Sequence, residues 1–237
     1  MTPSLRATLD HVAVAVPDRA SAAARWADQL GGGTVARDAN SGFAIHQLRY
    51  AGGGKLELLA PPDDPPAENF VSRFLKRYGP TIHHVTLKVG DLDSALAQIR
   101  AAGLDVVDVQ DTHPHWREGF LRPAQVGGLI VQVAWAAGSD EQWAAQLGQK
   151  PEPPRADAAT LLGPRLAHPD LGAARRLWET LGASITELGD ALVARWPDSP
   201  LTVEIVTGAR AGPVALRMRD APALEADATL GPAIVLD

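Results

Sequence analysis

The sequence predicts an α+β fold built from tandem βαβββ modules, because one pattern of residues occurs twice along the chain. The first copy is LDHVAVAVPD at residues 9–18, and the second is HHVTLKVGD at residues 83–91. In each copy a histidine begins a run of alternating small and branched residues, which is typical of a half-buried strand. A turn with an aspartate and an amphipathic stretch follow, which is how a strand leads into a helix.

A second apolar strand closes each copy and carries one polar residue in its middle. This residue is Glu57 in the first copy, 46 residues after His11, and Gln132 in the second copy, 48 residues after His84. The repeat therefore brings back a pair of potential metal ligands at nearly constant spacing.

The first copy contains the elements of one complete module. A strand is predicted over residues 8–16, and Asp18 can cap the next helix by accepting backbone N–H bonds. Apolar residues recur at helical spacing over 22–30, and the glycines at 31–33 end that helix. Three strands are predicted next, at residues 34–37, 43–50 and 55–60, with the glycines at 52–54 as a hairpin turn.

The second copy follows a proline-rich connector at 61–66 and a short helix. The apolar face of that helix carries Phe70, Phe74 and Leu75. The elements of the second copy are a strand at 83–89, a helix at 92–103 and further strands at 105–109, 119–122 and 129–135.

A third, degenerate copy follows a predicted helix at 139–147 and a linker at 150–154. AHPD at residues 167–170 aligns with AVPD at residues 15–18, and the same offset of 152 residues places Trp178 on Trp26. This copy ends with one predicted strand at 233–236.

The third copy has lost its ligand positions, because His11 aligns with Gly163 and His84 with Pro213. We therefore expect it to serve as a scaffold or as half of an intramolecular assembly, which either packs against the first two modules or forms a homodimer interface. The expected organisation is a metal-binding domain at 7–137, a helix and linker at 138–159 and a partly truncated, related domain at 160–237.

Composition limits the classes of function. The 237 residues carry a formal net charge of −6, whereas nucleic-acid binding requires a basic face. Cysteine is absent, so any metal must be bound by histidine, carboxylate or amide groups. The first residues lack the apolar core of a signal peptide, and no apolar run approaches the ~20 residues that span a bilayer. We expect a cytoplasmic protein with no nucleic-acid or membrane partner.

The repeated polar residues form a candidate metal site. Glu57 and Gln132 lie in otherwise apolar strands, and a carboxylate there is costly to bury unless it is paired or bound to a metal. Packing the two modules about a pseudo-twofold axis would bring together two imidazoles and two oxygen donors, from His11, Glu57, His84 and Gln132. This set suits one divalent ion, namely Zn²⁺, Ni²⁺, Co²⁺, Mn²⁺ or Fe²⁺, without choosing among them.

These residues resemble the vicinal oxygen chelate superfamily of glyoxalases, bleomycin resistance proteins and extradiol dioxygenases and, within it, methylmalonyl-CoA epimerases. The resemblance covers about residues 7–135. It implies paired βαβββ modules whose sheets curl around a metal-centred cavity, and a small-molecule substrate such as an acyl-CoA thioester. The strings that carry it are DHVAVAVPD at 10–18, KLELL at 55–59, HHV at 83–85, FLRP at 120–123 and GG at 127–128.

The sequence departs from this family at Gln132, where the epimerases that it resembles carry glutamate, whereas some of them carry glutamine at the position of Glu57. Exchanging glutamate and glutamine between the two positions still gives two histidines, one glutamate and one glutamine, but moves the carboxylate to the other side of the metal. The chemistry implied is stabilisation of an enolate or alkoxide beside a carbonyl, with a nearby group that moves the proton. Glu57 is the first candidate for proton transfer, and His46 and Glu118 are candidates for the second group.

The segment HPHWREGF at residues 113–120 concentrates imidazole, indole and guanidinium groups in a connection between strands. It is either a surface loop or a pocket wall. As a pocket wall it would offer His115 and Trp116 to a flat substrate and Arg117 to a carboxylate or phosphate. His83 is expected on the face opposite His84, as a packing or surface residue.

Three other functions stay open at this point. One is a glyoxalase-like lyase. Another is an iron-dependent dioxygenase, which would use two histidines and one carboxylate. The last is a non-catalytic protein that binds a small aromatic molecule or an antibiotic, with which the six tryptophans are compatible.

Overall fold

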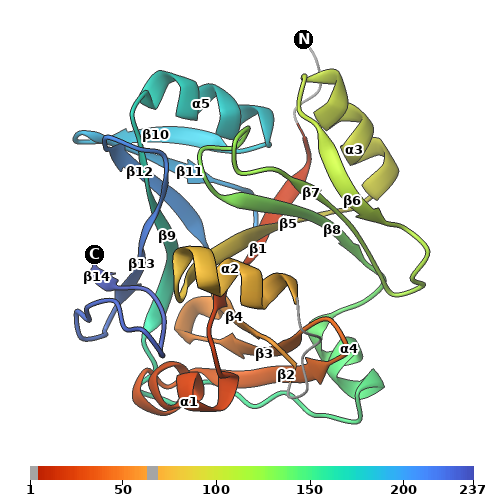
Figure 1. Cartoon of the computed structure of the whole chain (residues 1–237), viewed down its shortest axis with the longest axis vertical. Coiled ribbons are helices and arrows are strands. Elements are labelled where there is room, and N and C mark those ends of the chain that lie inside the picture. The colour runs from red at the N-terminus through yellow and green to blue at the C-terminus, as the bar shows by residue number, and fades with distance from the viewer. Residues whose placement is uncertain (1–4, 63–68) are drawn as a thin grey trace. The chain divides into compact units, whose positions relative to one another are not determined.

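The computed structural model describes residues 5–62 and 69–237 and shows two mixed β-sheets with helices packed on them (Figure 1). The strand order is β2-β3-β4-β1-β5-β8-β7-β6 in the first sheet and β10-β11-β12-β9-β13-β14 in the second. The predicted α+β class is therefore confirmed. Part of the predicted connector at 61–66 lies outside the described residues.

The strands of the first sheet are β1 (Ala7–Ala15), β2 (Gly33–Ala39), β3 (Ala44–Arg49), β4 (Lys55–Ala60), β5 (Thr81–Val89), β6 (Val106–Gln110), β7 (Trp116–Leu121) and β8 (Ile130–Ala136). Those of the second sheet are β9 (Thr160–His168), β10 (Ser184–Leu188), β11 (Ala191–Arg195), β12 (Thr202–Thr207), β13 (Gly212–Arg219) and β14 (Ile234–Leu236). The helices are α1 (Arg19–Ala23), the π-helix η1 (Ala24–Gln29), the 3₁₀ turn η2 (Ala51–Gly53), α2 (Phe70–Tyr78), α3 (Leu92–Ala101), α4 (Asp140–Gln146) and α5 (Leu171–Thr180).

The chain divides into two compact units, which are described separately here. The first unit comprises the described parts of Met1–His11, His84–Ala137 and Gly163–Val214. The second unit comprises those of Val12–His83, Gly138–Leu162 and Ala215–Asp237. The predicted division at 7–137, 138–159 and 160–237 follows the sequence repeat rather than these contacts, and it stays a prediction.

In the first unit, α3 packs on β6, β7 and β8, and α5 packs on β10, β11 and β12 (Figure 1). Both helices begin at an aspartate whose side chain accepts a backbone N–H bond, Asp91 for α3 and Asp170 for α5. Trp178 of α5 is buried edge-on against Trp196, with ring centroids 5.7 Å apart. Helix packing therefore explains this tryptophan without a ligand.

In the second unit, Asp18 caps α1 as predicted, because its carboxylate accepts from the backbone N–H groups of Ala20 and Ser21. The helix then widens into the π-helix η1, which the periodicity did not predict. The Tyr50 hydroxyl donates to the Trp26 carbonyl at 2.7 Å, and the Trp26 indole donates to the Leu230 carbonyl at 2.6 Å. These contacts from distant parts of the chain hold the wide turn in place.

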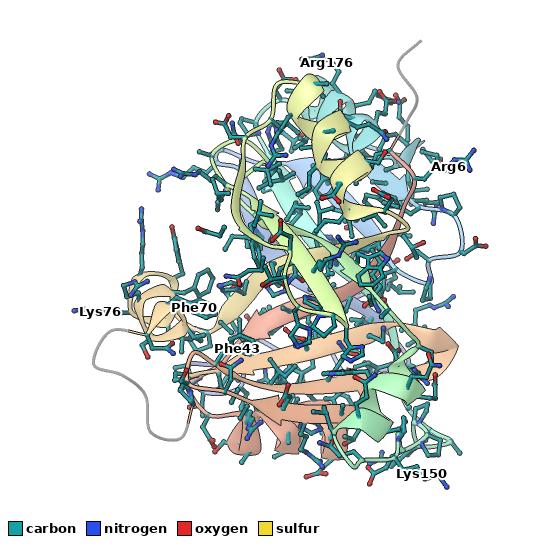
Figure 2. All side chains as sticks on the ribbon, turned by 90° about the vertical axis from the view of Figure 1, so that its right-hand side faces the viewer. Arg6, Phe43, Phe70, Lys76, Lys150 and Arg176 are labelled. Atoms are coloured by element: carbon teal, nitrogen blue, oxygen red, sulfur yellow. The ribbon has the colours of Figure 1, made fainter. Side chains whose placement is uncertain are left out.

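Helix α2 packs against the second unit with aromatic side chains. Figure 2 shows Phe70 on α2 near Phe43, while Lys76 of the same helix extends away from them. The ring centroids of Phe43 and Phe70 are 6.1 Å apart, and those of Phe74 and His83 are 4.5 Å apart. Of the two roles expected for His83, packing or surface, the structure shows packing.

Strand β7 begins at Trp116, three residues before the predicted strand. Its pairing with β8 is continuous from Trp116↔Ala136 to Leu121↔Val131. The structure corrects the expectation that Trp116, Arg117 and Glu118 belong to a connection, because these residues already form the sheet ladder.

The degenerate third copy contains an ion pair at the position that corresponds to Glu57 in the first copy. Arg165 of β9 lies opposite Glu204 of β12, as Ala13 of β1 lies opposite Glu57 of β4. The Arg165 guanidinium binds the buried Glu204 carboxylate. A cation from the chain itself therefore neutralises this carboxylate. In residues 5–62 and 69–237, no helix is long and apolar enough to cross a membrane.

Candidate metal centre

His11 lies in β1 and only 2% of its surface is exposed. The Nδ1 atom of its ring is 2.8 Å from Asp10 Oδ2, and the Nε2 atom is 3.0 Å from Thr86 Oγ1. The ring of His84 is edge-on to that of His11, with centroids 5.9 Å apart. A carboxylate on one imidazole nitrogen fixes the ring orientation and directs the other nitrogen to a metal.

Gln132 joins this group from β8. It pairs with Thr86 of β5, so their side chains share one face of the sheet. Thr86 Oγ1 donates to Gln132 Oε1 at 2.5 Å, and Gln132 Nε2 donates to Glu118 Oε2 at 2.6 Å. The same Glu118 oxygen accepts from Trp116 Nε1 at 2.5 Å. The first unit thus holds one continuous polar network that contains two of the four predicted ligands, His11 and Gln132, and the ring of a third, His84, lies edge-on to His11.

Glu57 is buried in β4 of the second unit. It lies opposite Ala13 on one side and Gln47 on the other, so the three side chains share a face. Because His11 is two residues before Ala13 in the same strand, its side chain projects from that face as well. Gln47 is also buried, and its Oε1 atom has no hydrogen-bond partner within the described residues.

His46 does not lie on the face of Glu57. It pairs with Leu58, the neighbour of Glu57 in β4, and side chains alternate between faces along a strand. Its Nε2 atom is 2.9 Å from Thr34 Oγ1. Burial first, and then the charges of Arg37 and Arg19, lower the pKa of His46 to about 4. The structure therefore does not bring this predicted proton-transfer residue together with Glu57.

This buried histidine gives an expected pH dependence of stability. Because the folded pKa of about 4 lies below the ordinary 6.5, the contribution is complete above pH 6.5 and is lost as the pH falls towards 4. The free energy of unfolding should fall between pH 7.5 and pH 4.5, and in His46→Gln, which retains a polar partner for Thr34, this fall should be smaller by about 2 to 3 kcal/mol. Urea unfolding at both pH values measures this difference. His115→Gln is the exposed control, and an equal acid loss in both variants would contradict the assignment.

The other predicted pocket residues are separated from one another. His115 is exposed before β7. Arg117 lies 4.6 Å from the Trp135 ring centroid and pairs with Asp93, whereas Trp116 is next to Glu118. Trp116 and Glu118 share the face of Gln132, and Arg117 projects from the opposite face.

The donor atoms fit a divalent cation. One ligand atom from each of His11, Glu57 and His84 lies within 4.8 Å of the others. Two ligands bound to one ion at about 2.1 Å lie between about 3.0 and 4.2 Å apart, depending on the angle at the metal, so the three atoms would have to move closer together to bind one ion. Imidazole and carboxylate donors suit mid-series divalent metals.

The polar residues that support these donors were not predicted from the sequence. Thr86 was on the predicted ligand face, two residues after His84, but a threonine in a strand is ordinary. Asp10 precedes His11 directly and was read as part of the motif only. Gln47 carries no sequence signal of its own, because its role depends on the pairing of β3 with β4.

The family comparison agrees with this fold. The sequence profile of the glyoxalase/bleomycin resistance protein/dioxygenase superfamily matches residues 10–120. Over this segment, which is just under half of the chain, the sequence is similar to that superfamily. The matched residues include His11, Glu57 and His84.

Three similar proteins are named as epimerases. The mitochondrial methylmalonyl-CoA epimerase of Mus musculus is 29% identical over 133 residues, which cover 54% of this chain and 72% of that protein. The ethylmalonyl-CoA/methylmalonyl-CoA epimerase of Cereibacter sphaeroides is 29% identical over 131 residues, covering 53% and 95%. The crystal structure of methylmalonyl-CoA epimerase from Mycobacterium tuberculosis aligns with a TM-score of 0.52 and 28% identity, covering 61% of this chain and 96% of that one.

Proposed function

We propose that this protein is a divalent-metal-dependent enzyme that moves a proton on the carbon beside a carbonyl group, as epimerases do. The observation that carries the proposal is the convergence of the donor atoms of His11, Glu57 and His84. The kinship to epimerases of acyl-CoA thioesters supports such a thioester as the substrate class.

His11, His84, Glu57 and Gln132 would hold the metal. When bound, a divalent ion withdraws electron density from a substrate carbonyl oxygen and makes the adjacent C–H group more acidic. Asp10 holds the ring of His11 in position through Nδ1. The amide of Gln132 supplies an oxygen donor without charge.

Glu57 is the proton-transfer group in this proposal. Its carboxylate has two oxygens, so one can bind the metal while the other accepts a proton from the substrate carbon. Gln47 shares the face of Glu57 and has a buried amide oxygen that accepts no hydrogen bond within the described residues. An amide does not accept a proton at neutral pH, so Gln47 orients the substrate or a water molecule beside Glu57.

One observation favours a second candidate function. Two histidines and one carboxylate are the ligand set of non-haem iron oxygenases, and His11, His84 and Glu57 supply it. Oxygen uptake by the Fe²⁺-loaded protein with a catechol-type substrate would favour this alternative, and its absence together with proton exchange would favour the epimerase class.

The decisive experiment is deuterium exchange with protein purified without a histidine tag. The protein loaded with Co²⁺, Ni²⁺, Zn²⁺ or Mn²⁺ should replace the α-hydrogen of methylmalonyl-CoA with deuterium from D₂O at a rate that follows metal content. His84→Ala should lose both the metal and the exchange, and His168→Ala, in the third copy, should lose neither. Metal-independent exchange, or no metal binding with any of these ions, would overturn the proposal.

A further inference from the structure

We propose that Glu118 is a positioning residue that fixes the amide of Gln132, so that the oxygen rather than the nitrogen of this amide faces the metal site. The inference rests on the proposed metal site and deepens it. It explains how a chain with glutamine at this ligand position can still bind a cation.

The strand register places Glu118 next to Gln132. Gln132 lies opposite Phe120 in β7, and Glu118 is two residues earlier on the same face. Glu118 Oε2 is 2.6 Å from Gln132 Nε2 and 2.5 Å from Trp116 Nε1. The indole N–H can only donate, so this oxygen must accept from Trp116.

The amide orientation follows from this chemistry. An ionised carboxylate offers only acceptors, so the group of Gln132 that points to Glu118 must be its NH₂. The Oε1 atom then points to the other side, where it accepts from the Thr86 hydroxyl. The same hydroxyl lies 3.0 Å from His11 Nε2. Two donors of the proposed metal site, an imidazole nitrogen and an amide oxygen, therefore converge on one hydroxyl.

Removing the Glu118 carboxylate would free this amide to turn over. A flipped Gln132 would present NH₂ to the site, and an NH₂ group is a hydrogen-bond donor that repels a cation. Loss of an outer residue that orients a metal ligand commonly reduces metal affinity by about 10- to 100-fold. We expect a reduction of this order for Glu118→Ala.

A rescue distinguishes this role from a merely structural one. Glutamate at position 132 needs no orienting partner, because both of its oxygens are acceptors. Adding Gln132→Glu to Glu118→Ala should therefore restore Co²⁺ affinity to the wild-type level or above. The exchange variant Glu118→Gln with Gln132→Glu keeps volume and hydrogen-bond pairing, and it should also bind Co²⁺ as the wild type does.

The measurement is Co²⁺ binding by titration calorimetry together with the visible absorption of bound Co²⁺, which reports the donor set without any turnover. Glu187→Ala, at an exposed ion pair with Arg175, is the control and should leave both unchanged. Wild-type affinity in Glu118→Ala, or failure of Gln132→Glu to rescue it while the wild type binds Co²⁺, overturns this inference alone. Absence of Co²⁺ binding by the wild type overturns the proposed metal site as well.

Discussion

Glu57→Gln is expected to reduce α-proton exchange by about 10²- to 10⁴-fold, which is the usual contribution of a proton-transfer group. Metal affinity should fall much less, because glutamine is isosteric and keeps an oxygen donor. Glu57 lies opposite Gln47 and Ala13 in the ladder, so its replacement introduces no new charge or volume in this buried row. Exchange kinetics and Co²⁺ titration of the same variant separate the two effects.

The control for this variant transposes the two side chains. Glu57→Gln combined with Gln132→Glu restores the inventory of two histidines, one glutamate and one glutamine. Metal affinity should then equal that of the wild type, so that a loss of exchange in the single variant is not caused by a loss of the metal. Exchange at the wild-type rate in the single variant would show that Glu57 is not the proton acceptor.

The repeated motif was sufficient to predict most of the first sheet. Strand β4 has the predicted bounds, and Asp18 caps its helix as predicted. Asp91 and Asp170, which occupy the same place in the repeat, also accept backbone N–H bonds. These features are local, because alternation and capping are properties of neighbouring residues. His11, Glu57 and His84 were selected as candidate ligands from the same repeat, and their role as ligands stays a prediction.

The face on which His46 projects could not be predicted from the sequence. Whether His46 or Gln47 lies beside Glu57 depends on the register of the hairpin between β3 and β4, and a slip of one residue exchanges the two. That register is set by the turn at Ala51–Gly53, where Gly52 and Gly53 have φ values of 76° and 92°. The glycines predict a turn but do not fix its length.

The start of β7 was missed for a related reason. Trp116, Arg117 and Glu118 do not alternate between apolar and polar side chains, so a pattern search ends at Gly119. In the fold, Trp116 and Glu118 turn to the polar network while Arg117 lies against Trp135. A strand that carries a polar network on one face lacks the alternation of apolar and polar residues by which strands are recognised in a sequence. The proposed role of Glu118 depends on this strand.

Gly163→Ala is expected to destabilise the protein by about 3 to 5 kcal/mol, which is the sum of two effects. Gly163 has φ of 119°, a conformation that residues with a side chain rarely adopt. A Cβ atom there would also lie 2.1 Å from the carbonyl oxygen of Thr202 in the neighbouring strand β12. Backbone atoms of a paired strand cannot yield as the end of a side chain does, so the strands must separate locally.

Gly189→Ala is the matched control, because Gly189 also has a positive φ, 62°, but an added Cβ would meet nothing within 4 Å. We expect it to cost about 1 kcal/mol, the effect of the backbone conformation alone. Denaturant unfolding of the two variants measures the difference. If both variants lost the same free energy of unfolding, the contact between the added Cβ atom and Thr202 would not destabilise the protein.

This expectation also explains why the third copy holds no metal ligand at the position of His11. Gly163 aligns with His11, and any residue with a Cβ, histidine included, meets the same Thr202 oxygen. In the same pair of strands, Arg165 already neutralises Glu204, which aligns with the closing strand of the first copy. A single substitution at Gly163 therefore cannot restore the ligand, and an imidazole introduced there would be accompanied by the loss of strand pairing rather than by metal binding.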